Sequence, residues 1–529
     1  MAAAAMVLGR GRTTRLVVAL ALACLVGASL LLLPRPAAAG AATPQSLKVL
    51  VGASSIWPTG LDPAPSTTGA ANAVMLDAIY GDLFSETPSG QIVPDLASGY
   101  TESNGGQTWT IHVRPGVTFS DGTPFNAQAV AFNIKRDLEP QYACACADNF
   151  PVTSITTPDA SSVVINLSEP FAPFIEGFIA TPPNWIVSPT ALQAQGEQSF
   201  KFKPVGAGPF TVTTDNVNSE LVVTRNPHYW KKGEPKLSSI TFSVIGSDAS
   251  AYDAMLGGQA NVDFGMDTLP IATQARKQFN VHEVTSETEI LEINTTTAPF
   301  NNLLAREAIF YATDSNALMK GFFGTTKYLD ESIDGPGGLF YEQRVPGYRT
   351  YDPAKAQALV KQLGGLHVNL LSLGYESGFL GSELTTAVQA QWAKAGITSS
   401  ISPVGSIASL VQDFKNNSWE AVPESTGGLD PSLAPGLAWR FAGNGPFTCC
   451  KDPQIDKLIT SGLATQDVSA RRQIYDQLWQ YMAKESDALV LFADPAPIGG
   501  WTLVDRKVGG ESLTHNNVST IDWGSVSVS

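Results

Sequence analysis

The stretch that decides the fold is Ile92–Arg136, which reads IVPDLASGYTESNGGQTWTIHVRPGVTFSDGTPFNAQAVAFNIKR. Within it, Thr108–Val113 alternates apolar and polar side chains, the pattern of a half-buried strand. Asn104–Gly106 supplies turn residues before that strand, and Ser120–Pro124 supplies a second turn after it. From Ala127 onward, apolar residues recur at helical spacing. We therefore expect a strand, a tight turn, a second strand and a helix, in that order.

The same alternation of strands and helices continues along the chain. Apolar spacing predicts helices near Leu76–Leu83 and Ile474–Met482, and a strand at Ile240–Val244. No short repeat or low-complexity linker interrupts the pattern. The sequence therefore indicates an α/β architecture. Its 529 residues are enough for two or three domains with a large core.

Residues 1–42 have the layout of a secretory signal. Arginines precede the apolar run Leu16–Leu33, small residues follow it, and we expect cleavage after Ala39 or Ala42. Two alternatives stay open. The apolar run is nearly long enough to remain as an N-terminal anchor, and Cys24 could carry a lipid instead. All three readings place the rest of the chain outside the cytoplasm, in the periplasm or at the cell surface.

The charge of the chain excludes some partners. The formal net charge is −15, and it becomes −19 without residues 1–42, which contain four arginines and no acidic residue. A strongly acidic protein is repelled by nucleic acid and by anionic membranes. We therefore expect neither as a partner, and we expect a monomer.

Four cysteines remain beyond the leader: Cys144, Cys146, Cys449 and Cys450. An even number in an oxidising compartment favours disulfides. Pairing within Cys144/Cys146 or within Cys449/Cys450 would close small, strained rings, so we expect cross-links between the two sets. The spacing is poor for a zinc site, and no metal is expected.

The chain also resembles a known family over roughly Leu47 to Val508. The matching segments are Pro94–Ala97, Trp109–Thr110, Val113–Val117, Phe119, Asp121–Phe125, Leu61–Pro63, Pro204–Phe210, Arg225–Trp230, Asn294–Phe300 and Asp452–Asp456. They resemble the signature segments of family 5 of the extracytoplasmic solute-binding proteins. Those proteins feed peptides, nickel chelates and some sugars to ABC importers.

The resemblance implies an α/β clamshell of two lobes, like a class II periplasmic binding protein. The first lobe would contain residues 43–87, 200–292 and 491–529, with an inserted subdomain at 88–199. The second lobe would be residues 293–490. A ligand would lie in the cleft between the lobes and be enclosed by hinge closure.

The sequence offers little for catalysis. HExxH, GxxxxGK and GxSxG motifs are missing, and the five histidines lie far apart. We therefore expect no catalytic residue, no metal ligand and no cofactor. A secreted α/β hydrolase stays open as the alternative from another class, because catalytic triads form in space rather than in sequence.

A binding cleft needs aromatic walls and a few polar anchors. Aromatic and polar residues in loops are the candidates, together with a loop at the place where peptide-binding relatives contact their ligand. The candidate ligand-binding residues are Trp57, Ser425, Thr426, Gly427, Trp439, Arg440 and Phe447. Packing in the core or at the rim is the alternative for both tryptophans.

The resemblance implies the substrate-binding component of an ABC importer, which delivers its solute to a membrane permease. A peptide-like solute is the first expectation. However, peptide-binding relatives commonly hold the ligand's ammonium on an aspartate shortly before an Asp-Pro step. That acid is missing before Asp430-Pro431. A glycoside or a metal chelate therefore stays open as the solute, as does a sensor that serves no importer.

Overall fold

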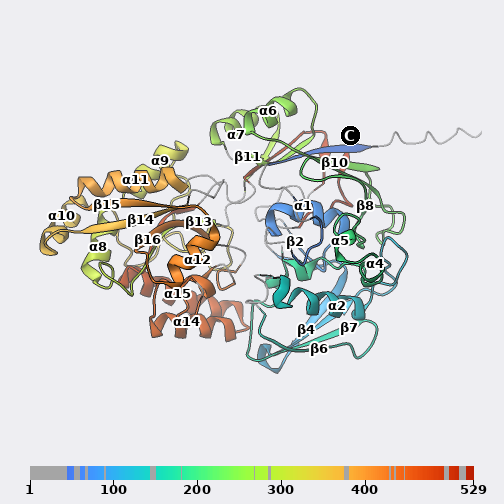
Figure 1. The fold of residues 1–529 in the computed structure, drawn as a ribbon, viewed down its shortest axis with the longest axis horizontal. Helices are drawn as coiled ribbons and strands as arrows, with labels where there is room; N and C mark the ends of the chain where they lie inside the picture. The colour runs from blue at the N-terminus through green and yellow to red at the C-terminus, as the bar shows by residue number, and fades with distance from the viewer. Residues whose placement is uncertain are drawn as a thin grey trace, which may run out of the picture. The chain divides into compact units, whose positions relative to one another are not determined.

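The computed structural model describes residues 45–52, 57, 60–65, 69–87, 91–142, 144, 150–179, 181–266, 268–283, 287–373, 381–427, 430–433, 436–445, 447–493, 500–510 and 520–529. Strands and helices alternate along these residues (Figure 1), so the predicted α/β class is confirmed. The expected signal, Cys24 and Cys146 lie outside the described residues.

The largest sheet has seven strands, in the order β12-β18-β11-β1-β10-β9-β8. These strands are β1 (Ser46–Val51), β8 (Phe210–Asn216), β9 (Glu220–Arg225), β10 (Ser239–Val244), β11 (Val262–Met266), β12 (Asn280–His282) and β18 (Trp501–Val504). β1 runs parallel to both neighbours, and the other pairs are antiparallel. Val49 and Leu50 of β1 belong to different hydrophobic clusters, so both faces of the sheet are covered.

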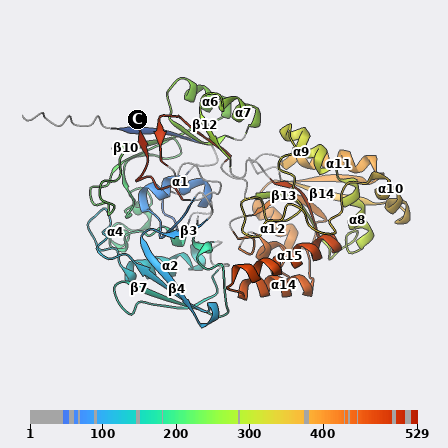
Figure 2. The same ribbon diagram turned by 180° about the vertical axis from the view of Figure 1, so that it is seen from behind.

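A second sheet has five strands, in the order β15-β14-β16-β13-β17. These strands are β13 (Glu287–Ile293), β14 (His367–Leu373), β15 (Thr398–Val404), β16 (Ala421–Gly427) and β17 (Ala488–Ala493). Leu291 and Ile293 point into one cluster and Ile290 into another, because neighbouring residues of a strand face opposite ways. Both faces are therefore apolar, and helices cover each of them (Figure 2).

Residues 97–167, which include most of the stretch Ile92–Arg136, form a four-stranded antiparallel sheet with a helix. The sheet has the order β4-β5-β7-β6. Its elements are β4 (Ala97–Ser103), β5 (Thr108–Val113), β6 (Val152–Thr156), β7 (Ser162–Leu167) and α2 (Ala127–Asp137). Alternate residues of β5 are buried, as predicted. α2 begins where the Asn126 side chain accepts a hydrogen bond from the Ala129 amide, which caps the helix.

The remaining helices cover the sheets. In the parts of the chain with the seven-stranded sheet they are α1 (Gly69–Tyr80), α4 (Pro189–Gln195), α5 (Glu197–Phe200), α6 (Asp248–Leu256) and α7 (Leu269–Ala275). With the five-stranded sheet they are α8 (Leu303–Ala312), α9 (Ser315–Phe323), α10 (Pro353–Gln362), α11 (Gly381–Lys394), α12 (Ile407–Lys415), α13 (Leu437–Arg440), α14 (Pro453–Ala464) and α15 (Val468–Glu485). The cluster on one face of that sheet contains residues of α8 to α11, and the cluster on the other contains residues of α12 to α15.

The sheets agree with the expected lobes in outline. All strands of the seven-stranded sheet fall within the ranges expected for the first lobe. The five-stranded sheet begins at Glu287 and ends at Ala493, a few residues outside 293–490. The boundaries themselves stay predictions. None of the helices among the described residues is long and apolar enough to cross a membrane.

One backbone hydrogen bond joins the inserted segment to the second sheet's helices. The Ala172 amide donates to the carbonyl of Leu463, at the end of α14, over 2.7 Å. Leu433 and Leu463 also pack against the apolar cluster of the inserted segment. Residues almost three hundred positions apart are therefore in contact here.

Candidate ligand-binding site

The candidates Ser425, Thr426 and Gly427 end strand β16, which pairs with β13. Thr426 lies opposite Thr288 in the register and is buried. Within the described part of the chain, its hydroxyl Oγ1 has no hydrogen-bond partner. A buried polar atom without a partner costs free energy in the empty protein, so it is available to an incoming polar group.

Arg440, at the end of α13, is buried against this end of the sheet. Its Nη1 lies 2.8 Å from Oε2 of Glu292 on β13 and also forms an ion pair with Glu424 on β16. Its Nη2 donates to the Ser425 carbonyl over 3.3 Å. The guanidinium therefore connects both strands and positions the Ser425 backbone.

Two carboxylates face one guanidinium here. Burial raises the pKa of Glu292 to about 7, and Arg440 opposes that rise. In the register of β13 and β16, each of these glutamates lies opposite an apolar residue of the other strand. Glu292 and Glu424 are therefore diagonal neighbours on the same face of the sheet. When both are ionised, the cluster of Glu292, Glu424 and Arg440 carries a formal charge of −1, which suits a cationic ligand group.

The candidates Trp439 and Phe447 lie together. Their rings are 5.5 Å apart, both side chains are half-buried, and the Phe447 amide donates to the Trp439 carbonyl. Gly445 permits this turn, because an added Cβ would lie 2.3 Å from the Trp439 carbonyl oxygen. The indole Nε1 of Trp439 is buried and has no hydrogen-bond partner among the described residues. This pair combines an aromatic wall with a free donor.

Trp57 lies elsewhere. It is fully buried in the core of the seven-stranded sheet, and its indole Nε1 donates to Asp215 Oδ1 over 2.8 Å. This environment matches packing in the core, which is the alternative to ligand contact for this tryptophan. Contact between Trp57 and a ligand stays a prediction.

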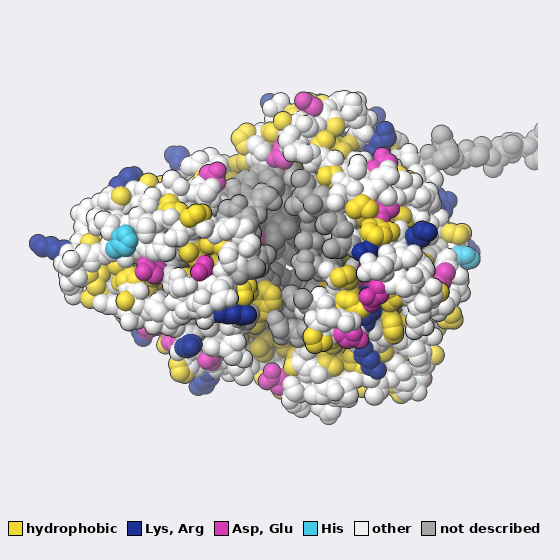
Figure 3. Space-filling view, in the orientation of Figure 1, with side chains coloured by type: hydrophobic (Ala, Val, Ile, Leu, Met, Phe, Trp, Pro, Cys, Tyr) yellow, Lys and Arg dark blue, Asp and Glu magenta, His cyan; other side chains and the backbone are white. Residues whose placement is uncertain are grey.

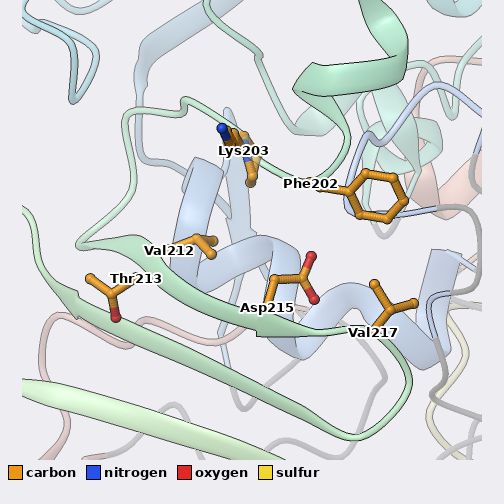
Figure 4. A pocket seen from close by; sticks show the side chains of 7 residues that line it. Phe202, Lys203, Val212, Thr213, Asp215 and Val217 are labelled. Atoms are coloured by element: carbon orange, nitrogen blue, oxygen red, sulfur yellow. The ribbon is translucent and has the colours of Figure 1, made fainter.

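Asp215 also borders a cavity of about 670 Å³. Figure 4 shows the Asp215 carboxylate on the side of β8 where Phe202 and Lys203 lie, while Thr213 points the other way. A β-bulge between Val212 and Thr214 shifts the alternation of β8 and so directs Asp215 to this side. Burial raises the pKa of Asp215, and the Trp57 hydrogen bond opposes that rise.

The expected cross-links between the two cysteine sets are wrong for this structure. Cys449 and Cys450 are free, buried thiols. Cys144 is buried in the cluster of the inserted segment, whereas Cys449 and Cys450 belong to a cluster of the second sheet. Because Cys449 and Cys450 are both free, neither of them is cross-linked to Cys144.

Sequence reasoning missed two buried ion pairs near the site. Asp430 pairs with Arg471 over 2.6 Å, so the Asp-Pro step has a structural partner and Asp430 is not a free anchor. The pair of Glu292 with Arg440 was also missed. Its signal was present in the sequence, because Glu292 interrupts an apolar strand pattern, and a buried charge requires a partner.

The charged side chains on one face of the molecule are mixed in sign. On the face in Figure 3, basic and acidic side chains are interspersed and form no basic stripe. No group of three or more potential metal ligands occurs among the residues that the structure describes.

Solved structures identify the class of the fold. The PBP AgaA from A.tumefacien R10, in complex with agropinic acid, matches with a TM-score of 0.73 at 24% identity, covering 92% of this chain and 99% of that one. The periplasmic binding protein DppA from Helicobacter pylori, in complex with peptide STSA, matches with a TM-score of 0.71 at 21% identity, covering 92% and 98%. The fold is therefore that of the two-lobe periplasmic binding proteins.

Sequence comparison then gives the family. The model described as "Bacterial extracellular solute-binding proteins, family 5 Middle" matches residues 91–447. The glutathione-binding protein GsiB of Salmonella typhi is 30% identical over 458 residues, which are 82% of this chain and 87% of the relative. The chain belongs to the family 5 solute-binding proteins. Members of this family are extracytoplasmic, bind peptides or other small ligands for ABC importers, and are not enzymes.

Proposed function

We propose that this chain binds a peptide-like solute at the surface formed by Ser425–Gly427, Trp439, Arg440 and Phe447, and delivers it to an ABC permease. The similarity to GsiB, a glutathione-binding protein, supports this class of solute. So does the fold shared with a DppA structure that holds a peptide.

The observation that carries the proposal is the combination of the half-buried Trp439–Phe447 pair with two unpartnered polar atoms. These atoms are Thr426 Oγ1 and Trp439 Nε1, which have no hydrogen-bond partner among the described residues. An aromatic wall with a few convergent polar groups is what a small-molecule site requires. A peptide group supplies both a carbonyl and an amide to such atoms.

The charge of the cluster narrows the solute further. When Glu292 and Glu424 are both ionised, their two negative charges outnumber the single positive charge of Arg440 by one. This excess favours a ligand that places a free ammonium against the two carboxylates. Peptide-binding relatives commonly hold the ligand's ammonium on an aspartate before an Asp-Pro step, and that aspartate is missing before Asp430-Pro431. In our proposal, the two glutamates take its role. The cluster would then hold the amino terminus of a short peptide.

Native mass spectrometry of the freshly purified protein would identify a co-purified solute, and calorimetry would then compare three ligands. They are glutathione, the same peptide with an acetylated amino group, and an opine. We expect the free peptide to bind and acetylation to lower the affinity by about tenfold or more, because one charge-assisted contact is lost. Tighter binding of the opine would contradict the proposal.

Two variants test the residues. Thr426→Val removes the hydroxyl at nearly the same shape, and Trp439→Phe removes the indole N–H but keeps an aromatic ring. Both should weaken binding with little change in melting temperature. Tyr351→Phe, at an exposed tyrosine, is the matched control. Unchanged affinity in both variants would remove these residues from the site.

We further propose that the protein is exported through residues 1–42 and acts as a monomer. The apolar run after three arginines supports export. Intact mass of the mature protein distinguishes cleavage, lipidation at Cys24 and retention as an anchor. Light scattering reports the oligomeric state, and a stable dimer would contradict the second part.

A further inference from the structure

Cys449 and Cys450 form a close pair of buried thiols. Their Sγ atoms are 2.8 Å apart, and neither cysteine is in a disulfide. A disulfide bond is about 2.05 Å long. The sulfur atoms therefore already face each other, and less than about 1 Å of approach separates them from bonding distance.

The backbone of this pair is tied to the candidate site. The Cys449 amide donates to the Arg440 carbonyl over 2.8 Å. The Cys449 carbonyl accepts from the Thr295 amide over 2.9 Å and from its hydroxyl. A change in the Cys449–Cys450 peptide would therefore reach Arg440 and the segment that follows β13.

We propose that Cys449 and Cys450 are a redox modification site, which closes to a disulfide between neighbouring residues in the exported protein. The two thiols lose two protons and two electrons, and a sulfur–sulfur bond forms between them. A protein or low-molecular-weight disulfide accepts the electrons. Its own sulfur–sulfur bond breaks, and its two sulfurs leave as thiols with the two protons.

The closed ring would be easy to reduce. Disulfides usually join Cα atoms 4.4–6.8 Å apart, whereas neighbouring Cα atoms are about 3.8 Å apart, so the ring is strained. Strained disulfides have higher reduction potentials and are the labile, regulatory ones. This strain argues against a permanent structural cross-link and in favour of a reversible one.

The burial of the two thiols determines at which stage the disulfide ring can form. Burial raises the pKa of the Cys449 thiol well above its usual range, which leaves little of the reactive thiolate. The oxidant also has no direct access to two fully buried sulfurs. The ring therefore forms on the newly exported chain before the turn packs, or during its openings.

The modification would act on the turn that carries Phe447. The ring fixes the Cys449–Cys450 peptide and so alters the hydrogen bonds to Arg440 and Thr295. The Trp439–Phe447 pair lies on the same turn. An effect on ligand affinity rests on the proposed function, whereas ring formation does not.

Peptide mapping tests the ring without any ligand. Exported protein is denatured with an alkylating agent in the absence of reductant and cut with trypsin. Cleavage after Arg440 and Lys451 yields Phe441–Lys451, which contains both cysteines. We expect this peptide to be unalkylated and lighter by two hydrogen atoms than its dithiol form, and to take two alkyl groups after reduction.

Four results would overturn or limit the proposal. Double alkylation without reductant overturns it, and so does a cross-link to Asp137–Lys201, the peptide with Cys144 and Cys146. The Cys144→Ser/Cys146→Ser double variant is the control and should keep the ring. Hydrogen exchange of Phe441–Lys451 should differ between the oxidised and reduced protein, and equal exchange overturns the effect on the turn. If the ring forms but peptide affinity is equal in both forms, the regulatory part fails while the proposed function stands.

Discussion

Arg440 Nη1 lies 2.8 Å from Glu292 Oε2, and both side chains are buried although they are 148 residues apart in the chain. The pair joins α13 to β13, and Glu424 adds a second carboxylate from β16. A buried charge is costly without its partner. The pair therefore fixes the position of α13, and with it Trp439, relative to the sheet.

Arg440→Leu should strongly destabilise the protein, because it leaves Glu292 and Glu424 buried without a counter-charge. We expect the free energy of unfolding to fall by about 3–5 kcal/mol. Urea denaturation measures it. Lys355→Ala removes an exposed ion pair with Asp352 and is the control, with an expected change of about 0.5 kcal/mol or less. Equal, small changes in both variants would contradict a structural role for the buried pair.

Trp57→Ala and Trp439→Ala should separate stability from binding. Trp57 is fully buried with a hydrogen bond to Asp215, so its loss should cost about 3–5 kcal/mol of stability. Trp439 is half-buried, so its loss should weaken ligand binding about tenfold or more at nearly unchanged melting temperature. Melting temperature and affinity are measured on both variants. A stable Trp57→Ala protein with weakened binding would instead place Trp57 at the ligand.

The stability of the protein should depend on the ionisation of Asp330. Burial raises its pKa to about 8, and hydrogen bonds from Ser332 and Thr288 oppose that rise. Between about pH 4 and pH 8 the folded protein therefore holds a proton that the unfolded chain releases. The contribution of this protonated carboxyl group to the stability of the fold is present below pH 4 and is lost as the pH rises through 8.

Asp330→Asn removes this titration and keeps an acceptor oxygen. We expect the stability of the variant to fall less steeply with rising pH than that of the wild type, by about 1 kcal/mol per pH unit near pH 6. Denaturation at several pH values gives the slope. Asp253→Asn, at an exposed aspartate, should keep the wild-type slope. Identical slopes for all three proteins would exclude the buried proton.

Local periodicity was enough to predict elements whose burial follows from their own sequence. β5 and α2 appear where alternating and helical spacing place them. Trp439 and Phe447 were predicted from their loop context, and the structure brings their rings together, although Trp439 lies on the short helix α13. Their contact with a ligand stays a prediction. The resemblance supplied the architecture, which periodicity alone could not order in space.

Long-range pairing could not be predicted in the same way. The partner of Glu292 lies on a helix that only the folded chain brings near, and the same is true of Asp430 and Arg471. The side of β8 to which Asp215 points depends on a bulge that no local pattern announces. The cysteine cross-links failed for a related reason, because the count of cysteines says nothing of which core each one joins.

Ligand binding should bring the lobes together. The Ala172 amide donates to the Leu463 carbonyl, and Leu433 packs against the inserted segment's core, so these contacts join parts of both lobes. Enclosure excludes water from the polar anchors. We expect small-angle scattering to show a smaller radius of gyration with saturating peptide, and the Ala172 amide to exchange more slowly.

Leu433→Ala removes part of the contact and should weaken binding by about tenfold or less at similar melting temperature. Scattering profiles that coincide with and without bound peptide would rule out closure as the way this protein holds its solute.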